Sequence, residues 1–307
     1  MIKWVLVTFA LIIIVLAALY PLENKERARL DAAARAGKPG QFIALAEGVT
    51  HYELTGADTS RTVVLLCAAT VPYYLWDPTR DSLVAAGFRV LRYDYFGRGL
   101  SDRPDIDFSL ATLDAQLLEL LDSLRIRSPV DIGGVSMGGV VAANFAHLHP
   151  SRVRTLTLVA PAFNMFDKTP FPMNVSGVGE YAAVFTVPNM AKSQGDLFFH
   201  PERFRDWADR WREQMRYEGF RRSVLSMIRG DILKKSPAEY APLGRSNLPI
   251  LLIWGRQDQI VPFERSAAVR AAFPGAEFHP IDSAGHIPQY ERPEAVAPLM
   301  IRFLREH

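Results

Sequence analysis

From Gln41 to the end of the chain, short apolar runs alternate with longer segments in which leucines recur at helical spacing. This alternation is typical of a parallel sheet covered by helices, because each strand needs a long crossover before the next parallel one. Several runs are apolar nearly throughout, as strands buried on both faces are. The sequence therefore predicts an α/β fold with a mostly parallel central β-sheet flanked by helices. The expected strands occupy residues 41–46, 50–54, 62–68, 88–94, 129–135, 154–160, 249–255 and 276–281.

The alternation breaks once, between Pro161 and Leu248, where the sequence becomes aromatic and helical. An insertion of this size between two core strands predicts a helical cap, or lid, packed over one face of the core. We assign residues 41–162 and 248–307 to the core and residues 163–247 to the cap.

The chain begins with an uncharged apolar run from Trp4 to Tyr20. As a helix this run would extend roughly 26 Å, close to the ~30 Å hydrocarbon thickness of a bilayer. We expect a single-pass membrane anchor over residues 1–22, followed by a charged juxtamembrane helix and linker over residues 23–40. A cleaved signal peptide with secretion is the alternative, since Lys3 supplies a basic start. The side of the membrane stays open, because basic residues after the run and the very short amino-terminal tail favour opposite orientations.

Composition restricts the partners. The net charge is only +2, from 35 basic and 33 acidic residues, so the chain lacks the one-sided charge of nucleic-acid-binding proteins. We expect a small-molecule substrate, with no nucleic acid, no cofactor and no metal, because no cluster of His, Cys and carboxylates has metal-ligand spacing. The single cysteine, Cys67, excludes an internal disulfide and is expected in the core. The oligomeric state stays open.

The strongest local motif is Gly134-Val135-Ser136-Met137-Gly138, which joins an apolar strand directly to a helix. Ser136 therefore lies at the apex of a sharp turn, exposed at a helix amino terminus where backbone N–H groups favour negative charge. Small residues are needed on both sides, since a side chain at Gly134 or Gly138 would collide in so tight a turn. The pattern predicts that Ser136 is a nucleophile.

A serine hydroxyl needs a base to take its proton, so one histidine should lie nearby. His286 is the best candidate, because it lies in a loop between the last expected strand and the final helix, where sites of α/β sheets assemble. The others lie within expected strands, on the helix after Ser136, in the insertion or at the terminus; they are His51, His147, His149, His200, His279 and His307.

A third residue should orient the imidazole and stabilise its cationic form. Asp258 follows a buried strand directly, and the chain order Ser136, Asp258, His286 is that of an α/β-hydrolase triad. Asp258 is alternatively an ordinary turn aspartate. Asp282, which also follows a strand, is the other candidate for the acid.

From about Thr62 to its end, the chain resembles lipases, esterases and other hydrolases of the α/β-hydrolase superfamily. Besides the triad, the resemblance includes the D-x-x-G-x-G-x-S pattern, IWGRQDQIVP and AGHIPQYERPE; the pattern consists of Asp94, Gly97, Gly99 and Ser101. It implies that the N–H groups of Ala69 and Met137 form the oxyanion hole. Ala68 stands where many relatives have glycine, and a glycine-only φ would be strained in alanine; whether this loop slows catalysis stays open.

We expect a serine carboxylic-ester hydrolase that works through an acyl-enzyme. The aromatic cap favours small apolar esters: monoesters, monoacylglycerols or aryl esters. A C–C bond hydrolase or perhydrolase would use the same triad, and a non-catalytic ligand-binding protein of this fold is the contrasting class. Cap arginines at positions 203, 205, 210, 212, 221 and 222 could instead select a carboxylate-bearing monoester. Haloalkane dehalogenases and epoxide hydrolases of the fold are excluded, since they have aspartate where this chain has Ser136.

Overall fold

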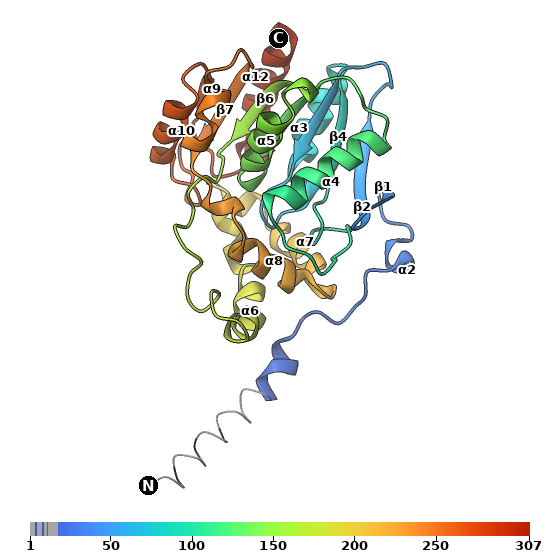
Figure 1. The fold of residues 1–307 in the computed structure, drawn as a ribbon, viewed down its shortest axis with the longest axis vertical. Coiled ribbons are helices and arrows are strands. Elements are labelled where there is room, and N and C mark those ends of the chain that lie inside the picture. The colour runs from blue at the N-terminus through green and yellow to red at the C-terminus, as the bar shows by residue number, and fades with distance from the viewer. Residues whose placement is uncertain (1–3, 5–7, 9–10, 12–17) are drawn as a thin grey trace.

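The computed structural model describes residues 4, 8, 11 and 18–307, and its centre is an eight-stranded sheet (Figure 1). The strand order is β1-β2-β4-β3-β5-β6-β7-β8; strands β3 to β8 are parallel, whereas β1 and β2 run antiparallel at one edge. The predicted α/β fold is therefore confirmed, with each strand within a few residues of its expected bounds. The strands are β1 Gln41–Leu45, β2 Gly48–Thr55, β3 Thr62–Leu66, β4 Arg89–Tyr93, β5 Val130–Val135, β6 Val153–Val159, β7 Ile250–Gly255 and β8 Glu277–Ile281.

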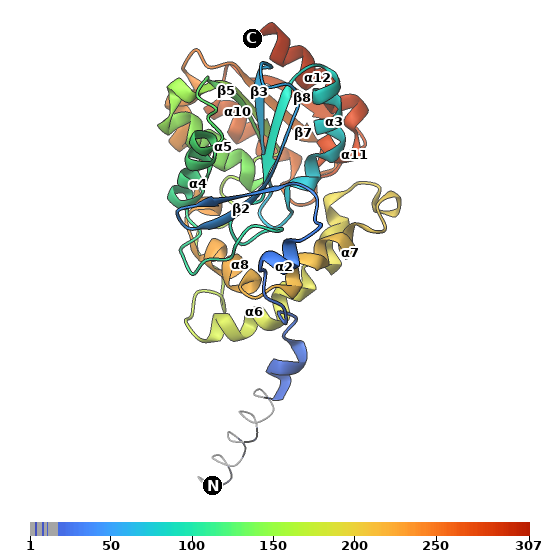
Figure 2. The same ribbon diagram turned by 90° about the vertical axis from the view of Figure 1, so that its right-hand side faces the viewer.

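Helices cover both faces of the sheet (Figure 2). On one face α3 (Asp77–Ala85) packs against α11 (Pro288–Glu291) and α12 (Pro293–Glu306), and on the other α4 (Leu110–Ser123) packs against α5 (Met137–Leu148). Strands β5 and β7 are buried along their whole length, which explains why their sequences are apolar without alternation. Helix α10 (Ser266–Ala272) connects β7 to β8.

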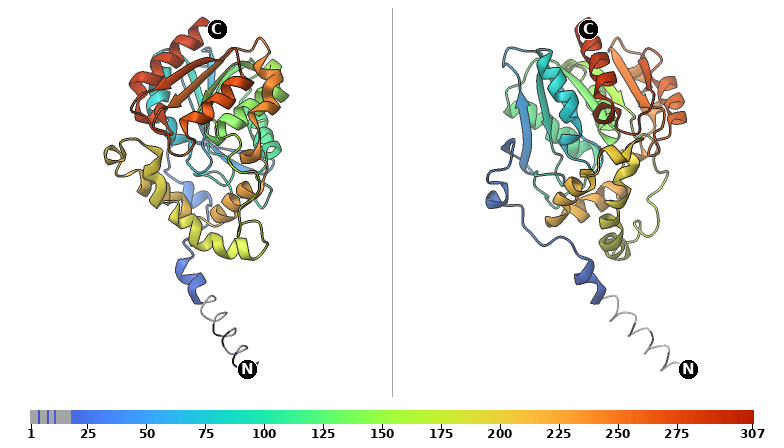
Figure 3. Two further views of the ribbon diagram at one scale, coloured as in Figure 1. Left: turned by 90° about the vertical axis from the view of Figure 1, so that its left-hand side faces the viewer. Right: turned by 180° about the vertical axis from the view of Figure 1, so that it is seen from behind.

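The chain between β6 and β7 forms the helical cap, which lies beyond one end of the sheet (Figures 1 and 3). Its longer helices are α6 (Val178–Asn189), α7 (Trp207–Arg212) and α8 (Phe220–Arg229), and α9 (Ala241–Gly244) leads back into the core. Phe198, Phe204 and Trp207 form an aromatic cluster with Tyr290 of the core. These three aromatic residues thus attach the cap to the core.

The segment before β1, where the sequence predicts a juxtamembrane helix and linker, contacts the cap. Its helix α2 spans only Ala32–Arg35, and residues upstream of it are bound to the cap. Ala28 forms a parallel bridge with Tyr217, and the Glu26 carboxylate accepts the N–H groups of Gly219 and Arg221 at the start of α8. A carboxylate at this position satisfies N–H groups that have no acceptor within the helix.

The expected anchor falls mostly outside the described residues, since only residues 4, 8, 11 and 18–22 of it are described. Among the described residues, no helix combines the length and apolar character needed to cross a membrane. The anchor stays a prediction. Helix α6 lies at the end of the molecule from which this amino-terminal segment leaves (Figures 1 and 2).

We predict that Glu26→Gln loosens the cap without unfolding the core. In this variant the N–H groups at the start of α8 bind a neutral amide oxygen instead of a carboxylate. This change should lower the free energy of unfolding by about 1 kcal/mol. Limited proteolysis should cut residues 163–247 faster in this variant than in wild type. Glu23→Gln is the matched control, because Glu23 pairs with the exposed Lys25 and, within the described part of the chain, forms no hydrogen bond or ion pair with α8. Equal cleavage rates for Glu26→Gln and Glu23→Gln would contradict this account.

Candidate active site

Ser136 occupies the junction between β5 and α5, in a backbone conformation that residues other than glycine rarely adopt. Its φ is 57° and its ψ is −123°, and the surrounding backbone holds it there. The Ser136 N–H donates to Val159 O at 2.9 Å, and its carbonyl accepts the N–H groups of Gly139 and Ala162, each at 3.0 Å. The predicted sharp turn is therefore present, with Ser136 at its apex.

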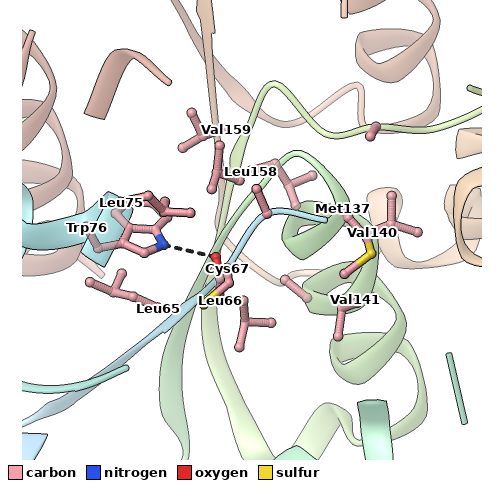
Figure 4. Packing of buried hydrophobic residues seen from close by; sticks show 14 of the residues in the cluster. Leu65, Leu66, Cys67, Leu75, Trp76, Met137, Val140, Val141, Leu158 and Val159 are labelled. Carbon is pink, nitrogen blue, oxygen red and sulfur yellow. Dashed lines mark hydrogen bonds between the residues drawn. The ribbon is translucent and has the colours of Figure 1, made fainter. Parts of the chain in front are cut away.

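The two glycines of this turn are required by space. A Cβ on Gly134 would lie 2.1 Å from Gly138 O, and one on Gly138 would lie 2.3 Å from Cys67 O. The first turn of α5 is thus pressed against the end of β3. Figure 4 shows Leu66 and Cys67 at this end, near Met137 and other residues of α5.

His286 and Asp258 are joined as the sequence predicts. His286 Nδ1 lies 2.8 Å from Asp258 Oδ2, and both side chains are buried. Asp258 Oδ1 accepts the N–H groups of Ile260 and Val261 at 2.9 Å each, which fixes the carboxylate. A proton on Nδ1 leaves Nε2 as the acceptor, and this buried Nε2 has no hydrogen-bond partner among the described residues.

The structure thus gives His286 a free basic nitrogen in a buried site. It does not give a hydrogen bond between His286 and Ser136; of the three predicted residues, it joins Asp258 and His286 only. The cap contributes to this site, since the His286 N–H donates to Leu197 O at 2.8 Å.

Asp282 is not the partner of His286. Its side chain is exposed and pairs with Arg256 at 2.7 Å. The other candidate histidines that pair with carboxylates do so elsewhere: His51 with Asp94, His149 with Asp114, His200 with Glu202 and His279 with Glu277.

The Asp94 carboxylate organises the loop that carries the D-x-x-G-x-G-x-S pattern. It accepts His51 Nδ1 at 2.7 Å, Tyr73 N at 2.9 Å and Leu100 N at 3.0 Å. Burial raises the pKa of Asp94, but the hydrogen bonds and the charge of His51 outweigh it and leave that pKa below its usual range. Burial lowers the pKa of His51, yet Asp94 outweighs it, so that pKa is raised. The pair joins β2 to the loop.

The loop after β3, residues 67–72, is called the β3 loop here, and it includes the predicted oxyanion donor Ala69. No residue of the β3 loop has a positive φ, so Ala68 is free of the strain that a glycine-only conformation would cause. Neither Ala69 N–H nor Met137 N–H has a hydrogen-bond acceptor among the described residues.

Sequence reasoning missed the side chains that hold the β3 loop. Arg98 Nε donates to Ala69 O at 2.5 Å, and Trp211 and Gln214 of the cap region donate to Thr70 O at 3.0 and 2.7 Å. Arg98 is buried, and none of its hydrogen bonds goes to a carboxylate. Burial and the charge of Arg103 lower the pKa of Arg98 to about 9. The sequence could have pointed to Arg98 only through its position inside the D-x-x-G-x-G-x-S pattern.

Two cavities flank this region. One of about 1460 Å³ lies between α6, α8 and residues 105–109, and another of about 190 Å³ lies beside Tyr73, Tyr74 and Gln214. Neither is lined by Ser136, Asp258 or His286, whose side chains are buried. Within the described part of the chain, no group of three or more His, Cys, Asp or Glu side chains is placed to hold a metal ion.

Residues 72–293 match the family model described as alpha/beta hydrolase fold. This chain belongs to the α/β-hydrolase family. It is 29% identical over 277 residues to a 2-hydroxy-6-oxononadienedioate/2-hydroxy-6-oxononatrienedioate hydrolase of Paraburkholderia xenovorans, covering 86% of this chain and 94% of that one. It is 30% identical over 230 residues to a 2-hydroxymuconate semialdehyde hydrolase of Pseudomonas putida, covering 71% and 77%.

Solved structures agree with the sequence relatives. A meta-cleavage product hydrolase from Pseudomonas fluorescens IP01 is similar at 25% identity and a TM-score of 0.72, covering 87% of this chain and 98% of that one. An esterase from Exiguobacterium antarcticum, at 22% identity and a TM-score of 0.72, covers 87% and 100% and shows the shared fold. The α/β-hydrolase family is thus confirmed, and the chain is a hydrolase of this family.

We predict that Asp258→Asn lowers kcat by roughly 10²–10⁴-fold, because an amide neither fixes the Nδ1–H tautomer of His286 nor stabilises its cation. Asp282→Asn is the control and should change kcat by less than about twofold, since that side chain is exposed and paired with Arg256. Steady-state kinetics on matched, folded proteins measure both. A normal kcat for Asp258→Asn would show that another residue orients His286.

Proposed function

We propose that this hydrolase attacks a substrate carbonyl with Ser136 and forms an acyl-enzyme that water then hydrolyses. His286 takes the Ser136 proton and gives it to the leaving group, while Asp258 stabilises the imidazolium. The observation that carries the proposal is the buried His286, whose Nδ1 is bound to Asp258 and whose Nε2 has no partner among the described residues. The N–H groups of Ala69 and Met137 are proposed to stabilise the oxyanion.

For the bond that is cut, we favour the C–C bond of a 2-hydroxy-6-oxo acid. The support is the likeness to hydrolases whose names specify such acids, at 28–30% identity and over most of their length. In this reaction the elements of water are added across the C–C bond beside the 6-oxo carbonyl: the oxo carbon becomes a carboxylate, and the leaving carbon takes a proton.

A carboxylic ester with a small apolar group is the second candidate. Four of the six cap arginines considered for an acidic substrate already have carboxylate partners: Arg210 with Asp77, Arg212 with Asp209, Arg221 with Glu26 and Arg222 with Asp105. These pairs leave fewer cap cations for a dicarboxylate, which favours a neutral monoester, monoacylglycerol or aryl ester. A perhydrolase and a non-catalytic binding protein remain as outcomes of the test.

A membrane anchor over residues 1–22 also remains a proposal. It is supported by the apolar run from Trp4 to Tyr20 and by the exposed side chains of Leu19 and Leu22, which are 38% and 65% exposed. Near the start of α6, Phe171 is 78% exposed, so this end of the molecule carries apolar surface on the cap as well.

We predict that a substrate panel separates the two bond types. The panel contains a 2-hydroxy-6-oxo-dienoate, followed by loss of its dienolate absorbance, together with p-nitrophenyl butyrate, a monoacylglycerol and an acidic monoester. We expect kcat/KM for the dienoate to exceed that for the esters by at least about tenfold, with Ser136→Ala as the blank. If neutral esters are cut best and the dienoate is untouched, the C–C assignment is wrong and the ester assignment replaces it. If nothing is cut, the catalytic proposal fails.

A further inference from the structure

The β3 loop is held by side chains from outside it. Residues 69 and 70 follow the last hydrogen-bonded residue of β3, so the sheet does not fix their backbone. Their carbonyls are bound instead: Arg98 binds Ala69 O, and Trp211 and Gln214 bind Thr70 O. All three side chains are buried. The position of the Ala69 N–H therefore depends on the cap and on Arg98.

Arg98 connects the β3 loop to helix α8. Its Nη1 donates to Ser223 Oγ at 2.5 Å, its Nη2 lies 3.3 Å from Met227 Sδ, and its guanidinium lies 5.8 Å from the centre of the Phe220 ring. Gln214 makes a similar connection, because its Oε1 accepts the N–H of Gly99, next to Arg98. Arg98 and Gln214 are each hydrogen-bonded to two or more separate segments. Each side chain therefore fixes the β3 loop relative to those segments.

Arg98 also brings an uncompensated positive charge. None of its hydrogen bonds reaches a carboxylate, and its side chain is out of contact with water. Covalent geometry places the Ala69 nitrogen within about 6 Å of Arg98 Nε. A buried cation at such a distance attracts negative charge that develops beside the Ala69 N–H, because little solvent screens the interaction.

We propose that Arg98 and Gln214 are positioning residues of the oxyanion hole: they fix the Ala69 N–H, and the Arg98 charge stabilises the oxyanion that this N–H binds. The inference rests on the proposed function, since it presupposes attack by Ser136 on a carbonyl. It explains how a loop with Ala68 in place of the glycine of many relatives is kept in place. It also makes the cap part of the catalytic apparatus.

The test compares four variants on the best substrate of the panel. Arg98→Met removes charge and hydrogen bonds, Arg98→Lys keeps the charge, and Gln214→Met removes only the bonds to Thr70 and Gly99. Arg103→Met is the matched control, because Arg103 is a neighbouring arginine whose hydrogen bonds among the described residues go to the carbonyls of Ser101, Gly99 and Gln214, and neither to a carboxylate nor to the β3 loop. Thermal unfolding of each protein reports any general loss of stability.

We expect Arg98→Met to lower kcat by about 10²-fold with KM changed less than about threefold, as for loss of an interaction made only in the transition state. Arg98→Lys should recover part of this loss, Gln214→Met should lower kcat about tenfold, and Arg103→Met should leave kcat within about threefold. Affinity for a trifluoromethyl ketone, which forms an oxyanion on Ser136, should fall in proportion to kcat.

Normal kcat in folded Arg98→Met, or equal losses in Arg98→Met and Arg103→Met, would overturn the inference while leaving the proposed function intact. If the Arg98 variants do not fold, an unchanged kcat and ketone affinity in Gln214→Met would overturn it. A wild-type protein that is inactive on the whole panel, or a Ser136→Ala variant that keeps the wild-type rate, would instead overturn the proposed function and the inference with it.

Discussion

The close contact between the start of α5 and the end of β3 is the constraint on which the candidate site depends. A single Cβ on Gly138 would meet Cys67 O at 2.3 Å, so the helix can approach the strand only with glycine there. This approach brings the Met137 N–H beside the β3 loop and places Ser136 at the carboxyl end of the parallel sheet. Asp258 and His286 reach the same end because each follows a parallel strand.

The cap also binds the backbone of residues at this end of the sheet. Through Leu197 it binds the backbone of His286, and through Trp211 and Gln214 it binds the β3 loop. The amino-terminal segment in turn binds the start of α8 through Glu26. The cap is thus hydrogen-bonded both to the segment that precedes the core and to the β3 loop, which carries a proposed oxyanion donor. A change in the cap's position would therefore shift the β3 loop and the backbone of His286.

The strands and the Asp258–His286 pair could be predicted from sequence because their signals are local. Apolar runs define buried strands, and Ser136 is marked by the two glycines that its turn requires. The roles of Arg98, Gln214 and Glu26 could not be predicted from sequence. Each of these residues contacts segments that are far apart in the chain and meet only in the fold. The geometry at Ala68 stayed open for the same reason: side-chain hydrogen bonds, rather than a glycine conformation, hold the β3 loop. The substrate is harder still to predict from sequence, because ion pairs formed in the fold decide which cap arginines are left to bind a charged group.

The central claim is that Ser136 is a nucleophile activated by His286, and active-site labelling tests it most directly. The full-length folded protein is treated with a fluorophosphonate, and its peptides are then analysed by mass spectrometry. The account predicts one modification per chain, on Ser136, that is absent after denaturation and strongly slowed in His286→Ala. A folded protein that remains unlabelled at Ser136, or is labelled there equally fast without His286, would contradict it.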